Sequence, residues 1–380
     1  MKPIHNSPKI VFVTPEFFPK NAGVANATLR FAKALLSKGY RVEVVTNKSK
    51  NDDKFEVYEG INIHRINWPN MPTIVLKVSA YLVMSFRKIM KIRSLRADIV
   101  FGETIIDGGV ASALAGKFCN CISVVQGHGT DVDKLNYSGY ERVLNWLSLN
   151  HNDIILTTNN DFKIKLEKYT KKEVLILPNV IDGPKVGMYR GKCRRDLHFD
   201  EKSFHVLFVG RLIEIKGIRY LIQAMKRLKD CKLHILGGGE LKSELESFVT
   251  ANNLNQRIFF YGRFPNEKVF EFMRACDVLV FPSIREGLSM TILESASVGL
   301  PIVATSVGGT LDVIRDEVNG LLIEKESYKA IEKAVTKLKT DKDLRERLSK
   351  NMMKTCNELF SEDKVVEKFE KIVKMRGGKE

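Results

Sequence analysis

The sequence predicts an α/β fold with two successive units, each a parallel sheet covered by helices. Short segments that are apolar along their whole length recur through the chain, as is typical of strands buried on both faces of a parallel sheet. They alternate with longer segments of helical period, and the alternation starts again after a polar, basic stretch at residues 184–203. A length of 380 residues is sufficient for two domains of ordinary size.

The first half opens with a predicted strand at 9–14, a loop at 15–23 and a helix at 24–37 that ends at Gly39. The loop lacks the glycine pattern of dinucleotide-binding folds, so a dinucleotide is not indicated. Gly23 at its end would nevertheless let a ligand approach the backbone closely. The further elements expected in this half are strands at 42–46, 98–102, 121–126, 153–157 and 173–177 and a helix at 108–118.

The second half repeats the pattern of strand, loop and helix. Its strands are predicted at 205–210, 231–236, 257–261, 277–283, 301–304 and 319–323. Residues 326 to about 375 are rich in lysine and glutamate and are expected to be helical. We therefore predict a first domain at 1–183, a linker at 184–203, a second domain at 204–360 and a last helix at 361–380.

The composition is that of a globular protein, with 44% apolar and 28% charged residues. No apolar run is long enough to cross a bilayer, and the N-terminus lacks the apolar core of a signal peptide. The six cysteines show no Cys-x-x-Cys spacing, which favours free thiols in a reducing compartment. These observations predict a cytoplasmic protein.

The net charge of +16 favours polyanionic partners. Nucleic acid is the weaker choice, because the sequence has neither zinc-finger spacing nor an aromatic RNA-binding signature. Residues 73–96 are apolar at first and basic later. They form either a helix packed on the sheet with a solvated basic end, or a patch attracted to anionic lipids at the inner face of a membrane.

Two glutamates, Glu286 and Glu294, flank a short apolar run between a predicted strand and a helix stop at 299–301. Eight positions along a helix advance roughly 12 Å, so the two carboxylates would not act on one atom as an acid–base pair. Between them, at about 287–290, we expect the free amides of a helix N-terminus, which bind anions. This spacing favours a long ligand with hydroxyls at both ends and phosphate in the middle, such as a nucleotide-sugar.

Other candidate groups fall at the carboxyl edges of the predicted sheets, where open α/β folds bind ligands. Arg211 and Lys216 follow the first strand of the second half, and two cations there can hold a diphosphate without a metal. Gly238 lies in a run of three glycines that suits phosphate or sugar. His128 lies between two glycines that let it reach into a cleft. The Asp-x-Asp at 131–133 is too short a match to assign a metal.

Taken together, these motifs resemble those of the family 4 retaining glycosyltransferases, which have the GT-B fold of two Rossmann-like domains facing across a cleft. The resemblance covers nearly the whole chain and is strongest from 205 to 325. The motifs that carry it are Gly210-Arg211-Leu212, Lys216-Gly217, Glu286 through Glu294, Gly308-Gly309 and Asn319-Gly320-Leu321-Leu322.

The resemblance implies a role for each matching position. Arg211 and Lys216 would neutralise the leaving nucleoside diphosphate. Glu286 would contact the donor sugar, and Glu294 the ribose hydroxyls. His128 would reach the donor sugar from the first domain. The last helix would cross back to this domain. The other residues implied to line the donor site are Gly23, Gly210, Gly238, Arg263, Phe264, Gly287, Leu288 and Ser289.

The implied reaction is glycosyl transfer with retention of configuration, from a nucleotide-sugar donor to a glycan or glycolipid acceptor. It would need neither metal nor cofactor, and domain closure would exclude water. Ala22, Val180 and Asp312 depart from the family pattern, which often has glycine, glycine and glutamate there, and Ala22 affects the acceptor side. The alternatives are a nucleotide-sugar epimerase or phosphorylase of the same architecture, and a membrane-surface scaffold that keeps a degenerate sugar-nucleotide site.

Overall fold

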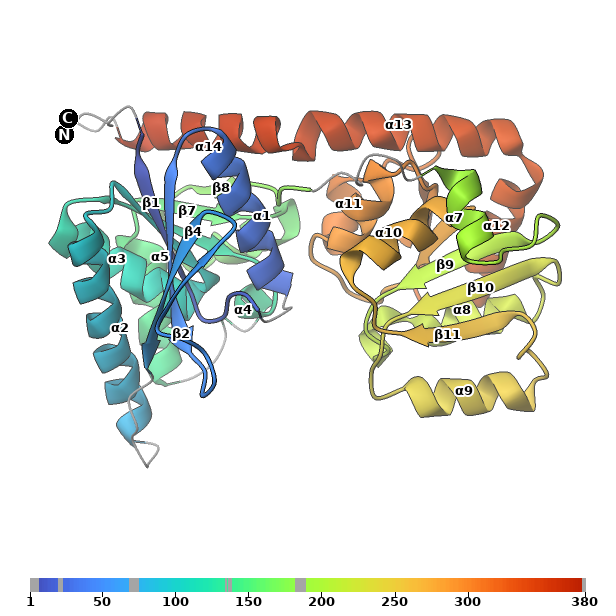
Figure 1. The fold of residues 1–380 in the computed structure, drawn as a ribbon, viewed down its shortest axis with the longest axis horizontal. Helices are drawn as coiled ribbons and strands as arrows, with labels where there is room; N and C mark the ends of the chain where they lie inside the picture. Colours follow the sequence, from blue (N-terminus) through green and yellow to red (C-terminus); the bar gives the residue numbers. More distant parts are fainter. Residues whose placement is uncertain are drawn as a thin grey trace. The chain divides into compact units, whose positions relative to one another are not determined.

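The computed structural model describes residues 7–19, 23–67, 75–133, 135, 139–181 and 189–377 of the chain. The chain divides into two compact units, the first made of residues 1–180 and 362–380 and the second of residues 181–361. Each unit contains a sheet with helices packed on both of its faces (Figure 1). The predicted α/β class, with two sheets that are mainly parallel, is therefore confirmed.

The sheet of the first unit has the strand order β3-β4-β2-β1-β5-β6-β7-β8 in the described residues. All neighbouring strands pair in parallel except β3 with β4. The strands are β1 Lys9–Thr14, β2 Arg41–Lys48, β3 Phe55–Tyr58, β4 Ile61–Asn67, β5 Ile99–Glu103, β6 Ile122–Gly127, β7 Ile154–Thr157 and β8 Val174–Ile176. The helices are α1 Gly23–Ser37, α2 Val75–Leu95, α3 Gly109–Cys119, α4 Thr130–Asp133, α5 Tyr140–His151, α6 Asn160–Leu166 and α14 Glu362–Gly377, with a π-helical turn at Thr104–Gly108.

A prediction that rests on continuous apolar runs does not identify the hairpin of β3 and β4. Its strands alternate more buried with more exposed side chains, because one face of the hairpin is open to solvent. Glu59 and Gly60 make the turn with φ angles of 48° and 82°, as a tight two-residue hairpin requires. An alternation of buried and exposed positions with a period of two residues is the pattern that identifies such half-exposed strands.

Helix α2 contains the basic segment, of which residues 73 and 74 lie outside the described part of the chain. Lys88 on this helix is fully buried, and its Nζ lies 2.9 and 2.8 Å from the two carboxylate oxygens of Asp107. This corrects the expectation of a basic end that faces solvent or lipid as a whole. No helix in the described residues, α2 included, is long and apolar enough to span a membrane.

Helix α14 belongs to the first unit although it follows the second unit in sequence. Phe369 is fully buried, and its ring centroid lies 5.3 Å from that of Phe31 and 5.9 Å from that of Phe101. A buried aromatic side chain contributes a large apolar area to a core. Residues near the end of the chain therefore complete the core that residues near its beginning start.

The second unit has the strand order β11-β10-β9-β12-β13-β14, and every neighbouring pair is parallel. The strands are β9 Phe204–Val209, β10 Cys231–Leu236, β11 Ile258–Gly262, β12 Val278–Phe281, β13 Ile302–Thr305 and β14 Leu321–Ile323. The helices are α7 Arg190–Asp196, α8 Ile218–Met225, α9 Lys242–Ala251, α10 Asn266–Ala275, α11 Met290–Ser297, α12 Tyr328–Thr340 and α13 Lys342–Phe360, with 3₁₀ turns at Glu214–Lys216 and Gly308–Asp312.

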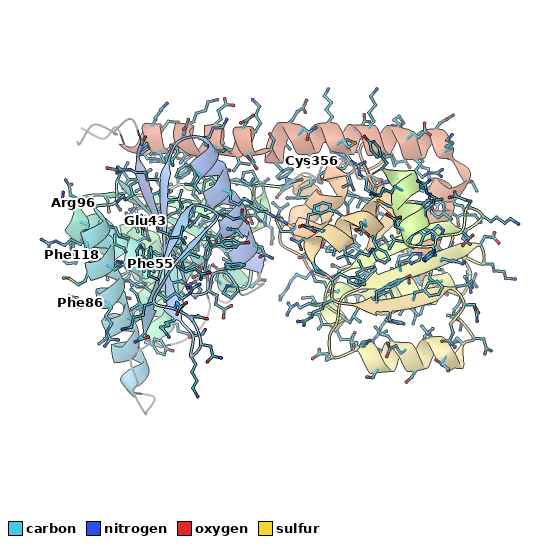
Figure 2. All side chains as sticks on the ribbon, in the orientation of Figure 1. Glu43, Phe55, Phe86, Arg96, Phe118 and Cys356 are labelled. Atoms are coloured by element: carbon cyan, nitrogen blue, oxygen red, sulfur yellow. The ribbon has the colours of Figure 1, made fainter. Side chains whose placement is uncertain are left out.

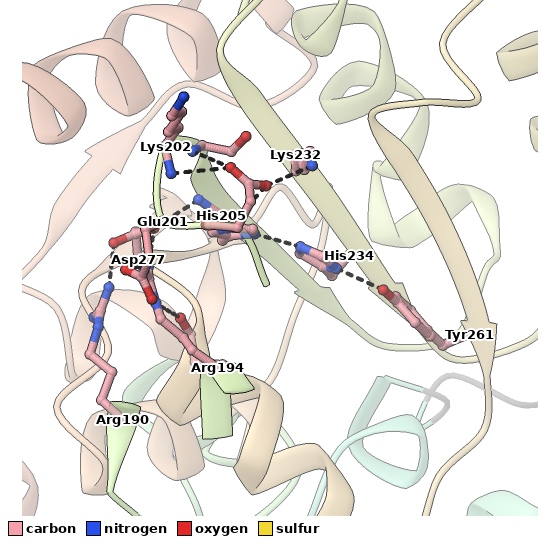
Figure 3. Close-up of polar contacts among 12 residues, drawn as sticks. Arg190, Arg194, Glu201, Lys202, His205, Lys232, His234, Tyr261 and Asp277 are labelled. Atoms are coloured by element: carbon pink, nitrogen blue, oxygen red, sulfur yellow. Dashed lines mark hydrogen bonds and ion pairs between the residues drawn. The ribbon is translucent and has the colours of Figure 1, made fainter. Parts of the chain in front are cut away.

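Residues 184–203 are expected as a linker. The described ones among them, 189–203, lie in the second unit and include helix α7. Arg194 holds this helix: it is buried, and its Nη2 donates to the Asp277 carboxylate at 2.9 Å (Figure 3). Arg190 and the backbone N–H of His205 donate to the same carboxylate. A polar, basic segment thus packs onto the unit because its arginines meet a buried acid, which composition alone does not reveal.

Replacing Asp277 with alanine should lower the melting temperature by about 6–12 °C. The change leaves Arg194 buried without its carboxylate, which costs about 3 kcal/mol in comparable ion pairs. Thermal unfolding followed by circular dichroism measures the shift. Glu317→Ala removes an exposed carboxylate that pairs with Lys337 and serves as the control, with a shift of no more than about 2 °C. Equal shifts in the two variants would contradict the importance of the buried pair.

Candidate functional site

Two loops of the second unit lie where its strand order reverses. From β9 the chain continues through β10 and β11 on one side, and it then returns through β12, β13 and β14 on the other. The loops after β9 and β12 therefore leave neighbouring strands in opposite directions, and open α/β sheets bind ligands at such a switch point. The first loop carries Arg211 and Lys216, and the second carries Glu286.

An ion pair joins these two loops. The Lys216 ammonium contacts the Glu286 carboxylate, and the two side chains are only 16% and 15% exposed. Ser283 Oγ donates to the same carboxylate oxygen at 3.2 Å, and the Lys216 nitrogen lies 5.2 Å from the ring centroid of Phe281. Partial burial strengthens the attraction between the charges relative to water. The structure thus brings the predicted Lys216 and Glu286 together.

Two glycines let the backbones of these loops touch. Gly217 has a φ of +62°, and a Cβ at this position would collide with the carbonyl oxygen of Pro282. Gly308 has a φ of +46°, and a Cβ there would collide with the carbonyl oxygen of Glu286. Only glycine combines a left-handed conformation with so close an approach. The Lys-Gly and Gly-Gly motifs therefore fix the position of the Glu286 loop.

The Glu286 loop leads into helix α11, whose N-terminus presents backbone amides. Within the described part of the chain, no acceptor receives the N–H groups of Gly287, Leu288 or Ser289. Ser289 is buried at the N-cap position, but its hydroxyl makes no capping hydrogen bond. Amides and helix dipole together attract an anion at such a terminus. Glu294 is half-buried in the second turn of this helix.

The remaining predicted residues of this unit follow β9, β10 and β11. The N–H of Gly210 donates to the Leu236 carbonyl at 3.0 Å, and the carbonyl of Gly238 accepts from the Leu212 N–H at 3.0 Å. Arg211 is exposed, and among the described residues no hydrogen bond or ion pair joins it to Lys216 or Glu286. Arg211 thus lies in the same loop as Lys216 without sharing its carboxylate.

Arg263 and Phe264 are exposed on the loop that follows β11. A chain of hydrogen bonds crosses the sheet just before this loop (Figure 3). His205 Nδ1 lies 2.9 Å from His234 Nε2, and His234 Nδ1 lies 3.0 Å from the hydroxyl of Tyr261. Burial lowers the pKa of His205 and lowers the pKa of His234 to about 3, so both rings are neutral at pH 7. This neutral network anchors the strand end from which Arg263 and Phe264 extend.

In the first unit the switch point lies between β1 and β5. Glu103 is the last residue of β5, is almost fully buried, and contacts His128 Nε2 with its carboxylate. Burial by itself would lower the pKa of His128, but the Glu103 carboxylate outweighs this effect and raises the pKa. The predicted His128 is therefore an oriented ring whose charged form is favoured.

The backbone around this pair is unusual. Thr104, directly after Glu103, has a φ of +80°, which is rare for a β-branched residue. Asp131 accepts hydrogen bonds from the N–H groups of Ile105, His128 and Gly129 at 3.1, 3.2 and 2.8 Å. These bonds hold the loops after β5 and β6 together. Strained backbone that its surroundings enforce is a feature of functional sites.

Gly23 is the first residue of α1, and no described atom lies within 4 Å of the position of a Cβ there. The described atoms therefore leave space beside this backbone position. A small pocket of the same unit is lined by nine residues, which are Ala27, Phe31, Glu103, Gln126, His128, Leu177, Pro178, Asn179 and Val180. Ala22 lies outside the described residues.

Sequence reasoning missed Glu103 and Ser283. Each lies at the carboxyl end of a strand next to the switch point of its sheet. A charged residue that ends an apolar strand was the available signal for Glu103. Ser283 has no comparable signal, because its role depends on the fold of the loop that brings it to Glu286.

The described residues contain no group of three or more His, Cys, Asp or Glu side chains arranged to hold a metal ion. The Asp-x-Asp segment illustrates this. Asp131 accepts from backbone amides, whereas Asp133 lies 2.9 Å from the Lys165 ammonium. The two carboxylates have separate structural partners.

Comparison with known proteins gives the family. Residues 21–183 match the family described as Glycosyltransferase Family 4, and residues 190–355 match the family described as Glycosyl transferases group 1. The chain therefore belongs to the glycosyltransferases that these two families describe. The resemblance seen in the motifs is confirmed, and the enzyme is a transferase.

Similar proteins extend over the whole chain. An Escherichia coli UDP-Gal:alpha-D-GlcNAc-diphosphoundecaprenol alpha-1,3-galactosyltransferase is 25% identical and covers 98% of this chain and 97% of its own length. An uncharacterised glycosyltransferase of Methanocaldococcus jannaschii is 25% identical over 97% and 98% of the two chains.

Solved structures confirm the GT-B fold. Sucrose-phosphate synthase from Thermosynechococcus elongatus aligns with a TM-score of 0.82 at 19% identity over 97% and 98% of the two chains. Anabaena HepE in complex with UDP aligns with a TM-score of 0.80 at 16% identity over 97% and 100% of the chains.

Acid should destabilise the protein through its neutral histidines. His205 and His234 have lower pKa values in the folded protein than in the unfolded chain, so below pH about 6.5 only the unfolded chain binds protons there readily. Their contribution to the stability of the fold is therefore complete above this pH and is lost as the pH falls towards 3. We expect the melting temperature to fall steadily from pH 6.5 to 5.

His234→Phe keeps a ring in the aromatic stack with Phe199 and should flatten this slope. His151→Asn, at an exposed position, is the control and should keep it. A slope unchanged in His234→Phe would contradict this origin of the pH dependence.

Replacing Glu103 with glutamine should lower the pKa of His128 below its ordinary value. Burial, the largest effect on this pKa, lowers it and remains, whereas the Glu103 carboxylate is gone and only the weaker influence of Asp131 still raises it. A pH titration of the labelled histidine ring by NMR measures the change. Glu43→Gln, which alters the carboxylate beside His64, should leave the His128 resonance unchanged. A His128 pKa that does not fall in Glu103→Gln would show that the carboxylate does not control it.

Proposed function

We propose that the protein transfers a sugar from a nucleoside-diphosphate sugar to a lipid-linked or cell-envelope glycan, with retention of configuration and without a metal ion. The observation that carries this proposal is the Lys216–Glu286 pair at the switch point, beside the free amides of Gly287 to Ser289. A cation, a row of amides and a carboxylate are the groups that a diphosphate and a sugar would need.

In the proposed reaction the bond between the anomeric carbon and the diphosphate oxygen breaks. An acceptor hydroxyl forms the new bond on the same face and passes its proton to the leaving diphosphate. Negative charge develops on the leaving diphosphate. Lys216, Arg211 and the α11 amides would stabilise this charge, which is the role that a metal plays in other transferases. Fixed charges in a partly buried site act strongly because they need no reorganisation.

The other predicted residues would position the donor. Glu286 would bind sugar hydroxyls, and Glu294 in the second turn of α11 would bind the ribose. Arg263 and Phe264 would lie at the nucleobase, and His128, oriented by Glu103, would bind the sugar. No carboxylate in this set is assigned as a nucleophile, so no covalent intermediate is proposed.

The names of relatives support the choice of donor and acceptor. The Escherichia coli relative is named for UDP-galactose and a diphosphoundecaprenol acceptor. Two others are named for teichuronic acid and for lipopolysaccharide core biosynthesis. A UDP-sugar and an acceptor on a lipid diphosphate are therefore the first pair to test.

The protein should transfer sugar from one of UDP-glucose, UDP-galactose or GDP-mannose to GlcNAc-diphosphoundecaprenol in the presence of EDTA. NMR of the product should show the same anomeric configuration as the donor. Arg211→Ala should lower turnover by about 10²-fold, because the charge on the leaving group loses its stabilisation.

Lys242→Ala removes an exposed cation of α9 on the same unit and should leave turnover unchanged. An inverted product would exclude retention. Loss of activity in EDTA that Mg²⁺ or Mn²⁺ restores would exclude the metal-independent mechanism.

A further inference from the structure

Helices α2 and α3 of the first unit pack against each other and expose three large apolar side chains. Phe86 and Met90, one turn apart on α2, are 62% and 50% exposed, and Phe118 on α3 is 64% exposed. Phe86 and Phe118 lie along the same side of the unit (Figure 2). Single exposed apolar residues are ordinary, whereas a group of this size on one surface marks an interaction site.

The exposed charged residues on these helices are all basic. Arg93 continues the face of Phe86 and Met90, Arg96 follows α2, and Lys117 precedes Phe118. In the described part of the chain none of these three cations pairs with a carboxylate. Neither helix contains an aspartate or a glutamate. We call the six residues Phe86, Met90, Arg93, Arg96, Lys117 and Phe118 the α2–α3 patch.

Lys88 differs from these three cations. It lies on the opposite side of α2, is fully buried, and is neutralised by Asp107. Helices that only meet solvent usually mix charges of both signs. A surface with one sign of charge around exposed aromatic and methionine side chains is instead the pattern of a helix that lies in the interface of a membrane.

Other partners fit this patch less well. A second copy of the chain would place equal positive charges opposite one another in a symmetric interface. A nucleic acid would pair with the cations but would leave Phe86, Met90 and Phe118 in water.

We propose that the α2–α3 patch docks the protein on an anionic lipid bilayer. The apolar side chains enter the boundary between headgroups and acyl chains, and the cations meet the anionic headgroups. This inference does not depend on the donor, the acceptor or the stereochemistry proposed above.

Flotation with lipid vesicles tests the proposal. The wild-type protein should float with vesicles of phosphatidylcholine and phosphatidylserine, and should stay behind with phosphatidylcholine alone. Arg93→Glu/Arg96→Glu should weaken binding by about fivefold or more for each changed residue. Phe86→Ser/Phe118→Ser should weaken it by about tenfold while leaving the charge unchanged.

Lys342→Glu/Lys354→Glu on α13 is the matched control, because both of its positions are exposed. Each reversal removes two charges, so this variant and the arginine variant both lower the net charge from +16 to +12. The control should float like the wild type. Unchanged melting temperatures would show that all variants are folded.

Three outcomes would overturn the proposal. The first is failure of the wild type to float with anionic vesicles. The second is an equal loss of vesicle binding in the α13 control, which would show that the effect depends on the net charge of the protein and not on the patch. The third is a Phe86→Ser/Phe118→Ser variant that binds vesicles as strongly as the wild-type protein. If a DNA oligonucleotide also competed with the vesicles, the patch would be a general site for polyanions.

Discussion

The candidate site of the second unit depends on how closely three backbone segments approach one another. Gly217 touches the chain at Pro282, and Gly308 touches it at Glu286. A side chain at either glycine would push the Glu286 loop away from the loop after β9. The contact between Lys216 and Glu286, and the direction of the amides at the start of α11, both follow from this approach. The electrostatic contacts of the site therefore depend on the close backbone approach that the two glycines allow.

The two units use the same arrangement at their switch points. In each, a carboxylate at the carboxyl edge of the sheet holds a cationic or protonatable side chain: Glu103 holds His128, and Glu286 holds Lys216. Each carboxylate orients its partner, and the Glu103 carboxylate also favours the charged form of His128. In the second unit the diphosphate of the proposed donor would compete with Glu286 for Lys216, so its binding would exchange one anionic partner of this lysine for another.

The sequence predicted the parallel strands and the glycine-rich loops well, because buried strands and left-handed turns impose strong local demands. The motifs singled out Lys216 and Glu286, and the structure brings the two side chains into contact, although no local rule pairs them. The hairpin β3–β4 was missed because its strands are half exposed. Glu103, Ser283 and Lys88 were missed or misjudged because their roles depend on partners 25, 3 and 19 positions away that only the fold brings together. Arg194 shows the same limit, since a residue in a polar segment became a buried anchor.

The position of α14 has a consequence for how the protein is made. The first unit begins with β1, yet its core includes Phe369, which the ribosome adds more than 350 residues later. The second unit, residues 181–361, is contiguous and can fold as soon as it has emerged. During synthesis the first unit must therefore wait with part of its apolar core uncovered while the second unit forms. A contiguous domain set inside a discontinuous one in this way makes the early part of the chain the one that most needs protection by chaperones.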